Sequence, residues 1–362
     1  MKTYLFVRNK KYRPSTYYRI YQYIEDIDIA NLKLCEYESD YFYEKNPKNK
    51  VLQTLNKLYF GFILGYIKRI VFIWNLYREN DYNVFVQREI FPRFIGPLGK
   101  FLLKRLLVRA NKVFWDFDDN IFDGREITVF ETQLLCKHTT EIFAGNEYLK
   151  QRLNDKYFNK VKIINTTDKM MENVDIDKIN IKRINEYDNE VVLVWVGTKG
   201  NLKFLENIIL DLDEAAMHLT NKEIVLRVVS NAKIDIKTEK LIIENIIWER
   251  KSAFKEMLNA HIGLMPLEDD ELTKGKCAFK AVQSIGCGLP IIVSNVGMNN
   301  EVVNGNGYLV NEKKEWVNFI IKLSSDKEEW IEKSISSRRL WERKFNSVKI
   351  SKMILEPLSS MK

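Results

Sequence analysis

The chain has 362 residues, which is the length of about two domains. Apolar residues make up 46% of the sequence, so each domain can bury a core. The four cysteines show no CxxC spacing, which argues against a disulfide scaffold or a zinc finger. The three histidines, His138, His218 and His261, are scattered, so we expect no metal site.

In the first half of the chain, six short apolar runs predict strands. Their residues are β-branched, aromatic and aliphatic in nearly continuous order, as in buried parallel strands. Helical segments between them predict right-handed βαβ units. The predicted strands are Tyr4–Val7, Leu32–Cys35, Val84–Val86, Val113–Phe117, Glu141–Ala144 and Val161–Ile164.

Segment 51–113 holds eleven lysines and arginines against three acidic residues, so it carries the whole net charge of +8. Leu98, Phe101 and Leu102 recur at helical spacing, which favours a basic amphipathic surface on an anionic membrane. The open alternative is an ordinary half-buried helix with a solvated basic face. No nucleic-acid-binding motif accompanies the charge, so we expect no nucleic-acid partner.

No signal peptide and no membrane-spanning helix is expected from the sequence. The start of the chain is charged too early for a signal peptide. The longest uncharged apolar stretch, Leu58–Ile67, is far shorter than the ~20 residues of a span. We therefore expect a cytoplasmic protein, peripheral on the inner face of the plasma membrane.

Charged residues follow three N-terminal elements. Asp118 and Asp119 come directly after the strand Val113–Phe117, where they could hydrogen-bond a sugar, take an acceptor proton or stabilise a cationic transition state. A capping or ion-paired aspartate couple is the alternative. Arg88, after Val84–Val86, and Arg19, in the first helix, could each hold an acceptor phosphate or form a structural ion pair.

A polar stretch at 168–190 predicts the boundary between two doubly wound α/β domains, at 1–185 and 186–340, with a central cleft. A C-terminal helix at 341–362 could cross back to the first domain. The strands predicted for the second domain are Val191–Val196, Ile224–Val229, Ile246–Trp248, Ile262–Met265, Ile291–Ser294 and Tyr308–Val310.

After the first of these strands comes a glycine-containing turn that opens a helix. Such a turn lets the backbone approach a diphosphate, and the helix N-terminus adds free N–H groups. Strand–glycine–helix turns are also common without any ligand. The candidate residues are Gly197, Thr198, Lys199 and Asn201.

Lysines and amides gather further along the second domain. Lys276 and Lys280 are four residues apart and so share one helix face. Asn299, Asn300 and Glu301 follow the strand Ile291–Ser294. Lysines for phosphates, with amides and a carboxylate for hydroxyls, predict a sugar-nucleotide site. The alternative is a salt-bridged surface loop.

Span Asn259–Val310 resembles the donor-binding core of family 4 glycosyltransferases, which have the GT-B fold. It is most similar to the bacterial surface-polysaccharide branch, and reads IGLMPLEDDELTKGKCAFKAVQSIGCGLPIIVSNVGMNNEVVNGNGYL here. The likeness extends to WVGTKGNLKFL, WDFDD, AGNEYL and RPSTYYRIYQY. These motifs run along nearly the whole chain in the family's order.

The resemblance implies two Rossmann-like domains facing a central cleft. It implies a hexosyltransferase that moves a sugar, with retention, from a nucleotide-diphosphate sugar to a saccharide or lipid-linked glycan in O-antigen, capsule or lipopolysaccharide synthesis. It implies no metal and no cofactor beyond the donor. The glycine turn, Lys276 and Lys280 would face the diphosphate. Residues 299–301 would lie near the donor sugar or the phosphates, and Gln283 would approach the ribose.

One departure from the family pattern keeps two alternatives open. The E-x7-E acids of the wider family are replaced by Gly275 and Gln283. A non-catalytic GT-B-like protein that binds a glycan or partner is therefore one alternative. A nucleotide-sugar 2-epimerase, which would need catalytic carboxylates and histidines, is the other.

Overall fold

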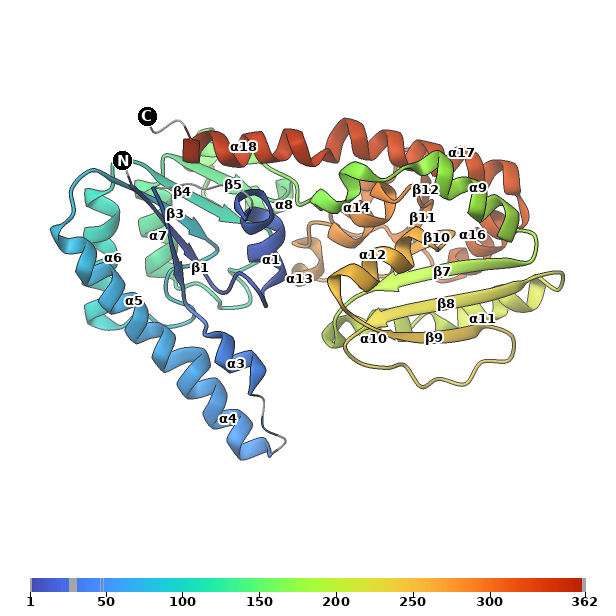
Figure 1. The fold of residues 1–362 in the computed structure, drawn as a ribbon, viewed down its shortest axis with the longest axis horizontal. Coiled ribbons are helices and arrows are strands. Elements are labelled where there is room, and N and C mark those ends of the chain that lie inside the picture. The colour runs from blue at the N-terminus through green and yellow to red at the C-terminus, as the bar shows by residue number, and fades with distance from the viewer. Residues whose placement is uncertain (1, 26–30, 46, 48, 360–362) are drawn as a thin grey trace. The chain divides into compact units, whose positions relative to one another are not determined.

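The computed structural model describes residues 2–25, 31–45, 47 and 49–359. The chain forms two compact units (Figure 1). Unit 1 runs to Thr166 and resumes at Val348, and unit 2 is Thr167–Ser347. The boundary lies earlier than the expected one at 185–186. The reason is that helix α9 (Ile176–Glu186) belongs to unit 2, where its buried Arg183 donates to the carbonyls of Met257 and Cys287.

Unit 1 is built on one parallel sheet of six strands in the order β2-β1-β3-β4-β5-β6. The chain order changes direction between β1 and β3, and such a switch point is where ligands bind in open α/β sheets. The strands are β1 Lys2–Val7, β2 Leu32–Glu36, β3 Tyr82–Gln87, β4 Val113–Phe117, β5 Glu141–Ala144 and β6 Val161–Ile163.

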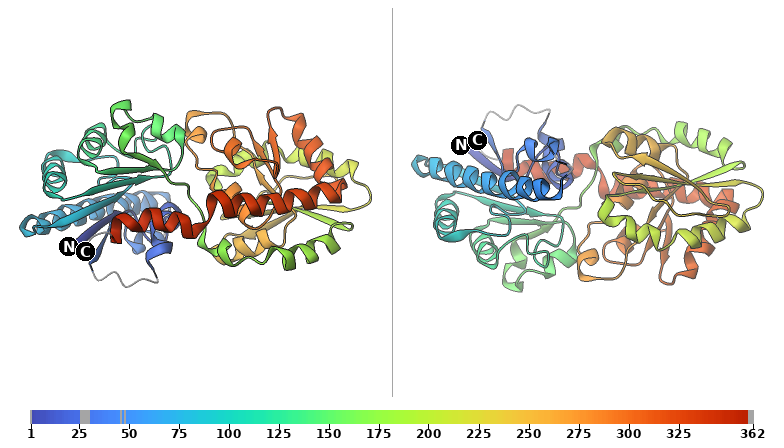
Figure 2. Two further views of the ribbon diagram at one scale, coloured as in Figure 1. Left: turned by 90° about the horizontal axis from the view of Figure 1, so that it is seen from above. Right: turned by 90° about the horizontal axis from the view of Figure 1, so that it is seen from below.

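Helices cover both faces of this sheet (Figure 2). The last helix, α18, belongs to unit 1, because Ile350 and Ile354 join Leu5 and Phe85 in its core. The α-helices are α1 Pro14–Thr16, α2 Gln22–Ile24, α3 Asp40–Glu44, α4 Lys50–Leu58, α5 Leu64–Asn75, α6 Gly96–Arg109, α7 Val129–His138, α8 Glu147–Gln151 and α18 Ser347–Ser359. Tighter or wider turns lie at Tyr17–Tyr21, Tyr59–Ile63, Leu76–Arg78 and Asp155–Lys160.

One helical run in unit 1 extends well beyond the apolar stretch Leu58–Ile67. Helices α4 and α5 are joined by a π-helical turn into a continuous run, Lys50–Arg78, of 29 residues. Among the described residues it is the one helix long and apolar enough to cross a membrane, and only 17% of its most apolar window is buried. The uncharged stretch Leu58–Ile67 is shorter than this helical run, because Lys57 and Lys68 interrupt the apolar sequence without ending the helix.

Unit 2 has a second parallel six-stranded sheet, in the order β12-β11-β10-β7-β8-β9. Its switch point lies between β7 and β10. The strands are β7 Glu190–Val196, β8 Glu223–Ser230, β9 Ile242–Ile247, β10 Ile262–Met265, β11 Ile291–Ser294 and β12 Gly307–Val310. The prediction for β9 was wrong in extent, because this edge strand is half exposed and Glu244 and Asn245 break its apolar pattern.

Unit 2 carries helices on both faces of its sheet (Figures 1 and 2). With α9 they are α10 Leu202–Glu206, α11 Ile209–His218, α12 Arg250–Leu258, α13 Glu271–Lys274, α14 Phe279–Gly286, α15 Asn299–Val302, α16 Lys314–Ser325 and α17 Lys327–Leu340. Tighter or wider turns lie at Lys169–Asn173, Lys199–Asn201 and Trp341–Phe345. The predicted class, two doubly wound α/β domains, is therefore confirmed.

Candidate functional site

In unit 2, the turn after β7 holds the first group of predicted residues. Gly197 is buried, and a side chain there would collide with the Trp195 ring at 2.3 Å, so only glycine fits. Thr198 and Lys199 are exposed. The helix expected after them is only the turn Lys199–Asn201 and the five-residue α10, which is too short to present a strong helix dipole.

A chain of buried polar contacts lies on α14 of unit 2. Lys280 Nζ donates to Gln283 Oε1 at 2.8 Å, and Gln283 Nε2 donates to Asp168 Oδ2 at 2.6 Å. Asp168 and Gln283 are both almost completely buried. Lys276 Nζ reaches from the preceding turn to Asn201 Oδ1 at 2.9 Å, so the structure brings the predicted Lys276 and Asn201 together.

The environment of this chain shifts two pKa values in opposite directions. Desolvation lowers the pKa of Lys280 to about 8, although the nearby Asp168 charge acts against it. Desolvation also raises the pKa of Asp168, although hydrogen bonds from Met170 N–H and Gln283 oppose the rise. Each charge is thus held in an environment that solvates it poorly. An anionic ligand beside Lys280 would restore its pKa and gain a strong charge-assisted contact.

Helix α14 begins at a residue with unusual backbone geometry. Ala278 precedes it with φ +46°, in the left-handed region that L-residues avoid, and has no side-chain oxygen with which to cap the helix. The N–H groups of an uncapped first turn, with Lys280 in that turn, favour negative charge. The N-terminus of α14 therefore suits a phosphate better than the turn after β7.

The predicted residues 299–301 separate in the structure. Asn299 is buried, and its Nδ2 donates to Ser294 O at 3.0 Å and Met265 O at 3.4 Å, which ties together the carboxyl ends of β11 and β10. Its buried Oδ1 has no hydrogen-bond partner among the described residues. Asn300 is exposed, and Glu301 lies on the surface paired with Lys344 at 3.2 Å.

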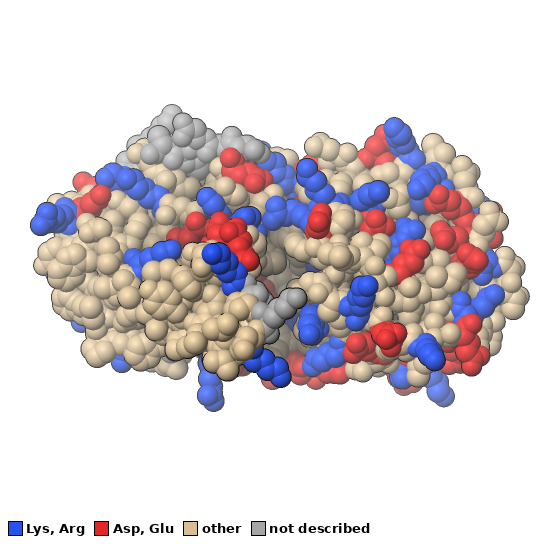
Figure 3. Space-filling view, turned by 60° about the horizontal axis from the view of Figure 1, so that its bottom comes forward, with Lys and Arg blue, Asp and Glu red and all other residues tan. Residues whose placement is uncertain are grey.

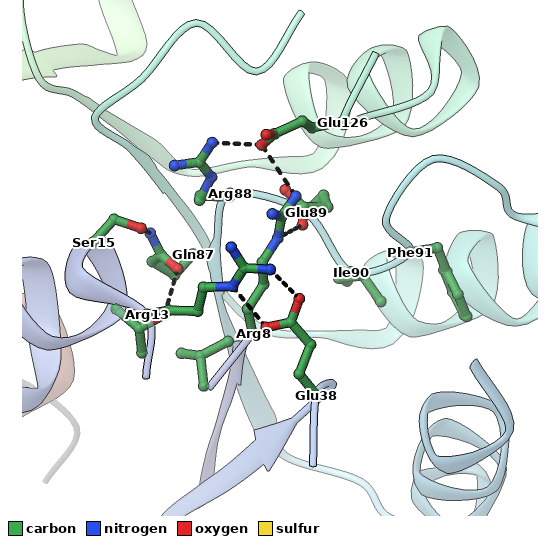
Figure 4. Close-up of polar contacts among 12 residues, drawn as sticks. Arg8, Arg13, Ser15, Glu38, Gln87, Arg88, Glu89, Ile90, Phe91 and Glu126 are labelled. Carbon is green, nitrogen blue, oxygen red and sulfur yellow. Dashed lines mark hydrogen bonds and ion pairs between the residues drawn. The ribbon is translucent and has the colours of Figure 1, made fainter. Parts of the chain in front are cut away.

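In unit 1, charged side chains collect at the carboxyl ends of four adjacent strands, β2, β1, β3 and β4. Figure 4 shows those that follow β2, β1 and β3. Arg88 follows β3 with φ +69°, and this strained backbone is held by its N–H on Asp116 O at 2.7 Å. Its guanidinium contacts Asp119 Oδ2 at 2.9 Å and also Glu126. The structure thus brings the predicted Arg88 and Asp119 together.

Arginines from the first strand region complete this cluster (Figure 4). Arg8, directly after β1, contacts the fully buried Glu89 and reaches Glu126 Oε2 at 3.0 Å. Arg13 binds both carboxylate oxygens of Glu38. Sequence reasoning missed these residues, although Arg8 and Glu38 follow β1 and β2 as Arg88 follows β3.

Asp118 is the unusual carboxylate of the cluster. It is buried, with its nearest Arg88 nitrogen at 3.8 Å, while Asp119 is half exposed and holds that arginine more closely. Desolvation and the Asp119 charge raise the pKa of Asp118 to about 7, against the attraction of Arg88. Asp118 is therefore suited to exchange a proton near neutral pH.

Two buried residues have structural roles, Arg19 in unit 1 and His261 in unit 2. Arg19 has no exposed surface, and its guanidinium is bound to Asp116 and to the Ile164 carbonyl. The sequence left two roles open for Arg19, binding an acceptor phosphate or forming a structural ion pair. The structure shows the ion pair, so we assign Arg19 no acceptor role. His261, given no role from the sequence, accepts from Val192 N–H at 3.0 Å, and burial lowers its pKa to about 4.

Another residue that sequence reasoning missed is Asp168, which lies in the stretch interpreted as a boundary. It follows the predicted strand Val161–Ile164 closely, as other site residues follow their strands. That position was the signal in the sequence that could have identified Asp168.

In the described part of the chain, no group of three or more His, Cys, Asp and Glu side chains is placed to hold a metal ion.

Comparisons with known proteins establish the fold. Neither a protein-family model nor a curated protein matches the sequence. HepE of Anabaena in complex with UDP-glucose is similar in structure, with a TM-score of 0.66 and 12% identity over 99% of this chain and 100% of that one. A glycosyltransferase from Rickettsia africae has a TM-score of 0.62 and 15% identity, covering 99% of this chain and 98% of that one.

A third similar structure is more distant. Sucrose-phosphate synthase of Thermosynechococcus elongatus has a TM-score of 0.56 and 12% identity, over 82% of this chain and 78% of that one. The chain has the GT-B fold. The part of the sequence resemblance that concerned fold is therefore confirmed.

Proposed function

We propose that this protein is a glycosyltransferase that moves a hexosyl group from a nucleotide-diphosphate sugar to a saccharide or lipid-linked glycan. The observation that carries the proposal is a pair of lysines, Lys276 in the turn before α14 and Lys280 in its first turn, of which Lys280 is desolvated beside Gln283 and Asp168. That pair lies on a GT-B chain, and HepE of the same fold binds UDP and UDP-glucose. We therefore favour UDP as the nucleotide.

In this reaction the bond between the anomeric carbon and the phosphate oxygen breaks, and its electrons leave with the diphosphate. Lys276 and Lys280 would neutralise the charge that develops on the leaving oxygen. The buried Gln283 is bonded on both sides by Lys280 and Asp168, which fixes where the ammonium points. We propose that Asn299, with its unpartnered Oδ1, and the more exposed Asn300 and Glu301 lie toward the donor sugar.

Unit 1 would supply the acceptor side. The acceptor hydroxyl oxygen forms the new bond to the anomeric carbon, and its proton needs a base. Asp118, with a pKa of about 7, can take that proton, while Asp119 and Arg88 hold each other in place. We further propose a surface polysaccharide such as O-antigen, capsule or lipopolysaccharide as the product, with retained anomeric configuration.

The two alternatives differ in what the site would need. A 2-epimerase needs ionisable histidines beside its carboxylates, but the buried His261 is engaged by Val192 and lies beside the Arg183 carbonyl. A non-catalytic binding protein would retain nucleotide affinity without turnover. The strained backbone of Arg88 and the raised pKa of the buried Asp118 beside it are features that cluster at active sites, and this favours the enzyme.

The test combines binding with turnover. Thermal-shift and calorimetric titrations with UDP, GDP, ADP and CMP would be made on the wild type, on Lys280→Ala and on Lys255→Ala, a matched exposed lysine on α12. We expect one diphosphate to stabilise the wild type and the Lys255→Ala control, and not Lys280→Ala. A ligand at 100 times its Kd stabilises by about 2.7 kcal/mol.

The same preparations would then be given the matching nucleotide sugar and glycan acceptors. Release of the diphosphate with transfer of the sugar supports the proposal, and the anomeric proton of the product reports retention by NMR. Binding without turnover would favour the non-catalytic alternative. A protein that folds but binds no nucleotide would contradict the proposal.

A further inference from the structure

The helical run Lys50–Arg78 of unit 1 presents an apolar face to solvent. Six of its side chains are between 38% and 56% exposed and are spaced by three, four or seven residues, which places them on one side of the helix. They are Leu52, Leu55, Tyr59, Ile63, Ile67 and Trp74. We call this set the apolar stripe. Figure 3 brings this region of unit 1 forward and shows a broad area without charged side chains.

The opposite side of the same run is held in the core of unit 1. Gly65, Arg69 and Ile73 are buried, again at helical spacing. Arg69 has no exposed surface, and its guanidinium donates to Val7 O at 2.6 Å and Cys35 O at 2.7 Å, at the ends of β1 and β2. The helix is thus fixed along the sheet by its middle, with the apolar stripe turned outward.

The charged residues on the same helical run as the apolar stripe are all basic. The run Lys50–Arg78 contains five basic residues and no acidic one. Lys57 and Lys68 are exposed and form no ion pair with the described residues. Helix α6 packs beside α5, also lacks acidic residues, and adds the exposed Leu98 and Phe101 with Lys100 and Lys104.

We propose that this face of unit 1 lies in the interface of an anionic lipid bilayer. An apolar helix face bordered by lysine and arginine, with tryptophan and tyrosine on it, matches the layered chemistry of acyl chains below and charged headgroups above. The apolar stripe enters the bilayer surface, while Lys57 and Lys68 contact lipid phosphates. This inference is independent of the proposed transferase activity.

Two other occupants fit the observations less well. A helix that spans the bilayer would have to leave the sheet, which would break the Arg69 contacts with Val7 and Cys35 and bury that guanidinium in hydrocarbon. A second copy of the chain would bring two basic faces together, with Lys57 and Lys68 facing like charges. The exposed lysines therefore favour a surface of opposite charge.

Vesicle co-sedimentation tests the proposal with the full chain. Two vesicle preparations would be compared, one of phosphatidylcholine alone and one of equal parts phosphatidylcholine and phosphatidylglycerol. We expect binding to the anionic vesicles that weakens as salt is raised, because salt screens the headgroup attraction. The variant Leu55→Asn/Ile63→Asn/Ile67→Asn should lose this binding, and Lys57→Glu/Lys68→Glu should weaken it at least tenfold.

A matched control carries three similar changes away from the apolar stripe, Val129→Asn/Ile181→Asn/Ile247→Asn, at side chains of 74%, 64% and 74% exposure. It should bind as the wild type does. Should the stripe variant fold poorly, Trp74 gives a second measurement, because brominated lipid should quench its fluorescence and Trp74→Phe should abolish that component. Vesicle binding that the stripe variant retains would overturn the proposal, as would a dimer that the stripe variant makes monomeric in the absence of lipid binding.

Discussion

The two units place charge at equivalent ends of similar sheets, but with opposite balance. In unit 1, Arg8, Arg13 and Arg88 face five carboxylates, those of Glu38, Glu89, Asp118, Asp119 and Glu126. In unit 2, Lys280 lies near the buried carboxylate of Asp168, and Lys276 contacts the neutral Asn201.

This difference decides which group titrates unusually in each unit. Burial, reinforced by the neighbouring Asp119 charge, raises the pKa of Asp118 in unit 1 to about 7, and burial lowers the pKa of Lys280 in unit 2 to about 8. An excess of negative groups suits a proton acceptor or a developing cation, and an excess of positive groups suits a diphosphate. The comparison thus supports the separate chemical tasks that we propose for the two units.

The largest expected effect comes from removing the proton acceptor of unit 1. Asp118→Asn keeps the size of the side chain but cannot accept a proton, so sugar transfer should fall by about 100-fold or more. Nucleotide affinity should stay unchanged, since that belongs to unit 2. Diphosphate release and calorimetry measure the two quantities, with the exposed Asp155→Asn as a control. Full activity in Asp118→Asn would contradict the proposal that Asp118 accepts the proton of the acceptor hydroxyl.

The next largest effect should come from unit 2. Lys280→Ala removes a charge-assisted contact worth about 1.5–3 kcal/mol, so the Kd for the nucleoside diphosphate should rise roughly 10- to 100-fold. Calorimetric titration measures this change. The affinity for the nucleoside alone should differ little, because it carries no phosphate. An equal loss for nucleoside and diphosphate would place Lys280 away from the phosphates.

The pH dependence of stability provides a third test of unit 1. The unfolded chain releases the Asp118 proton near pH 3.8, and the folded chain holds it to about pH 7. Between these values the unfolded state binds fewer protons, so the free energy of unfolding falls as pH rises, by about 1 kcal/mol per pH unit from this group.

Asp118→Asn should therefore lose this part of the decline and be more stable than the wild type at pH 8. Urea unfolding at pH 5 and pH 8 measures it. Glu131, whose pKa is raised to about 8 by burial, contributes a similar decline in both proteins and cancels in the difference. Identical slopes in the two proteins would show that Asp118 is ionised at neutral pH.

The smallest effect concerns the chain of contacts behind Lys280. The negative charge of Asp168 raises the Lys280 pKa against desolvation, so Asp168→Asn should lower that pKa below about 8. Diphosphate affinity, which needs the ammonium, should then begin to fall at a lower pH than in the wild type. We expect a loss of a few-fold near pH 8, seen by titrating across pH 6 to 9, and none at pH 6. A pH-independent loss would indicate a purely structural role.

The sequence predicts the frame of the molecule better than its polar contacts. Buried parallel strands are nearly continuous in apolar residues, so their runs are visible without any structure. The half-exposed β9 is the exception, since Glu244 and Asn245 disrupt its pattern. Contacts between distant segments leave no such trace. Asp168 and Gln283 are 115 residues apart, and the burial of Arg19 against Asp116 joins residues 97 apart.

Helix α18 has a consequence for how the protein is made. Unit 2 is one continuous stretch, Thr167–Ser347, but the core of unit 1 contains Ile350 and Ile354. A ribosome therefore synthesises all of unit 2 before it releases the residues that complete unit 1. The first domain to be translated is the last whose core can close, and in the meantime its unfilled apolar face is available to chaperones.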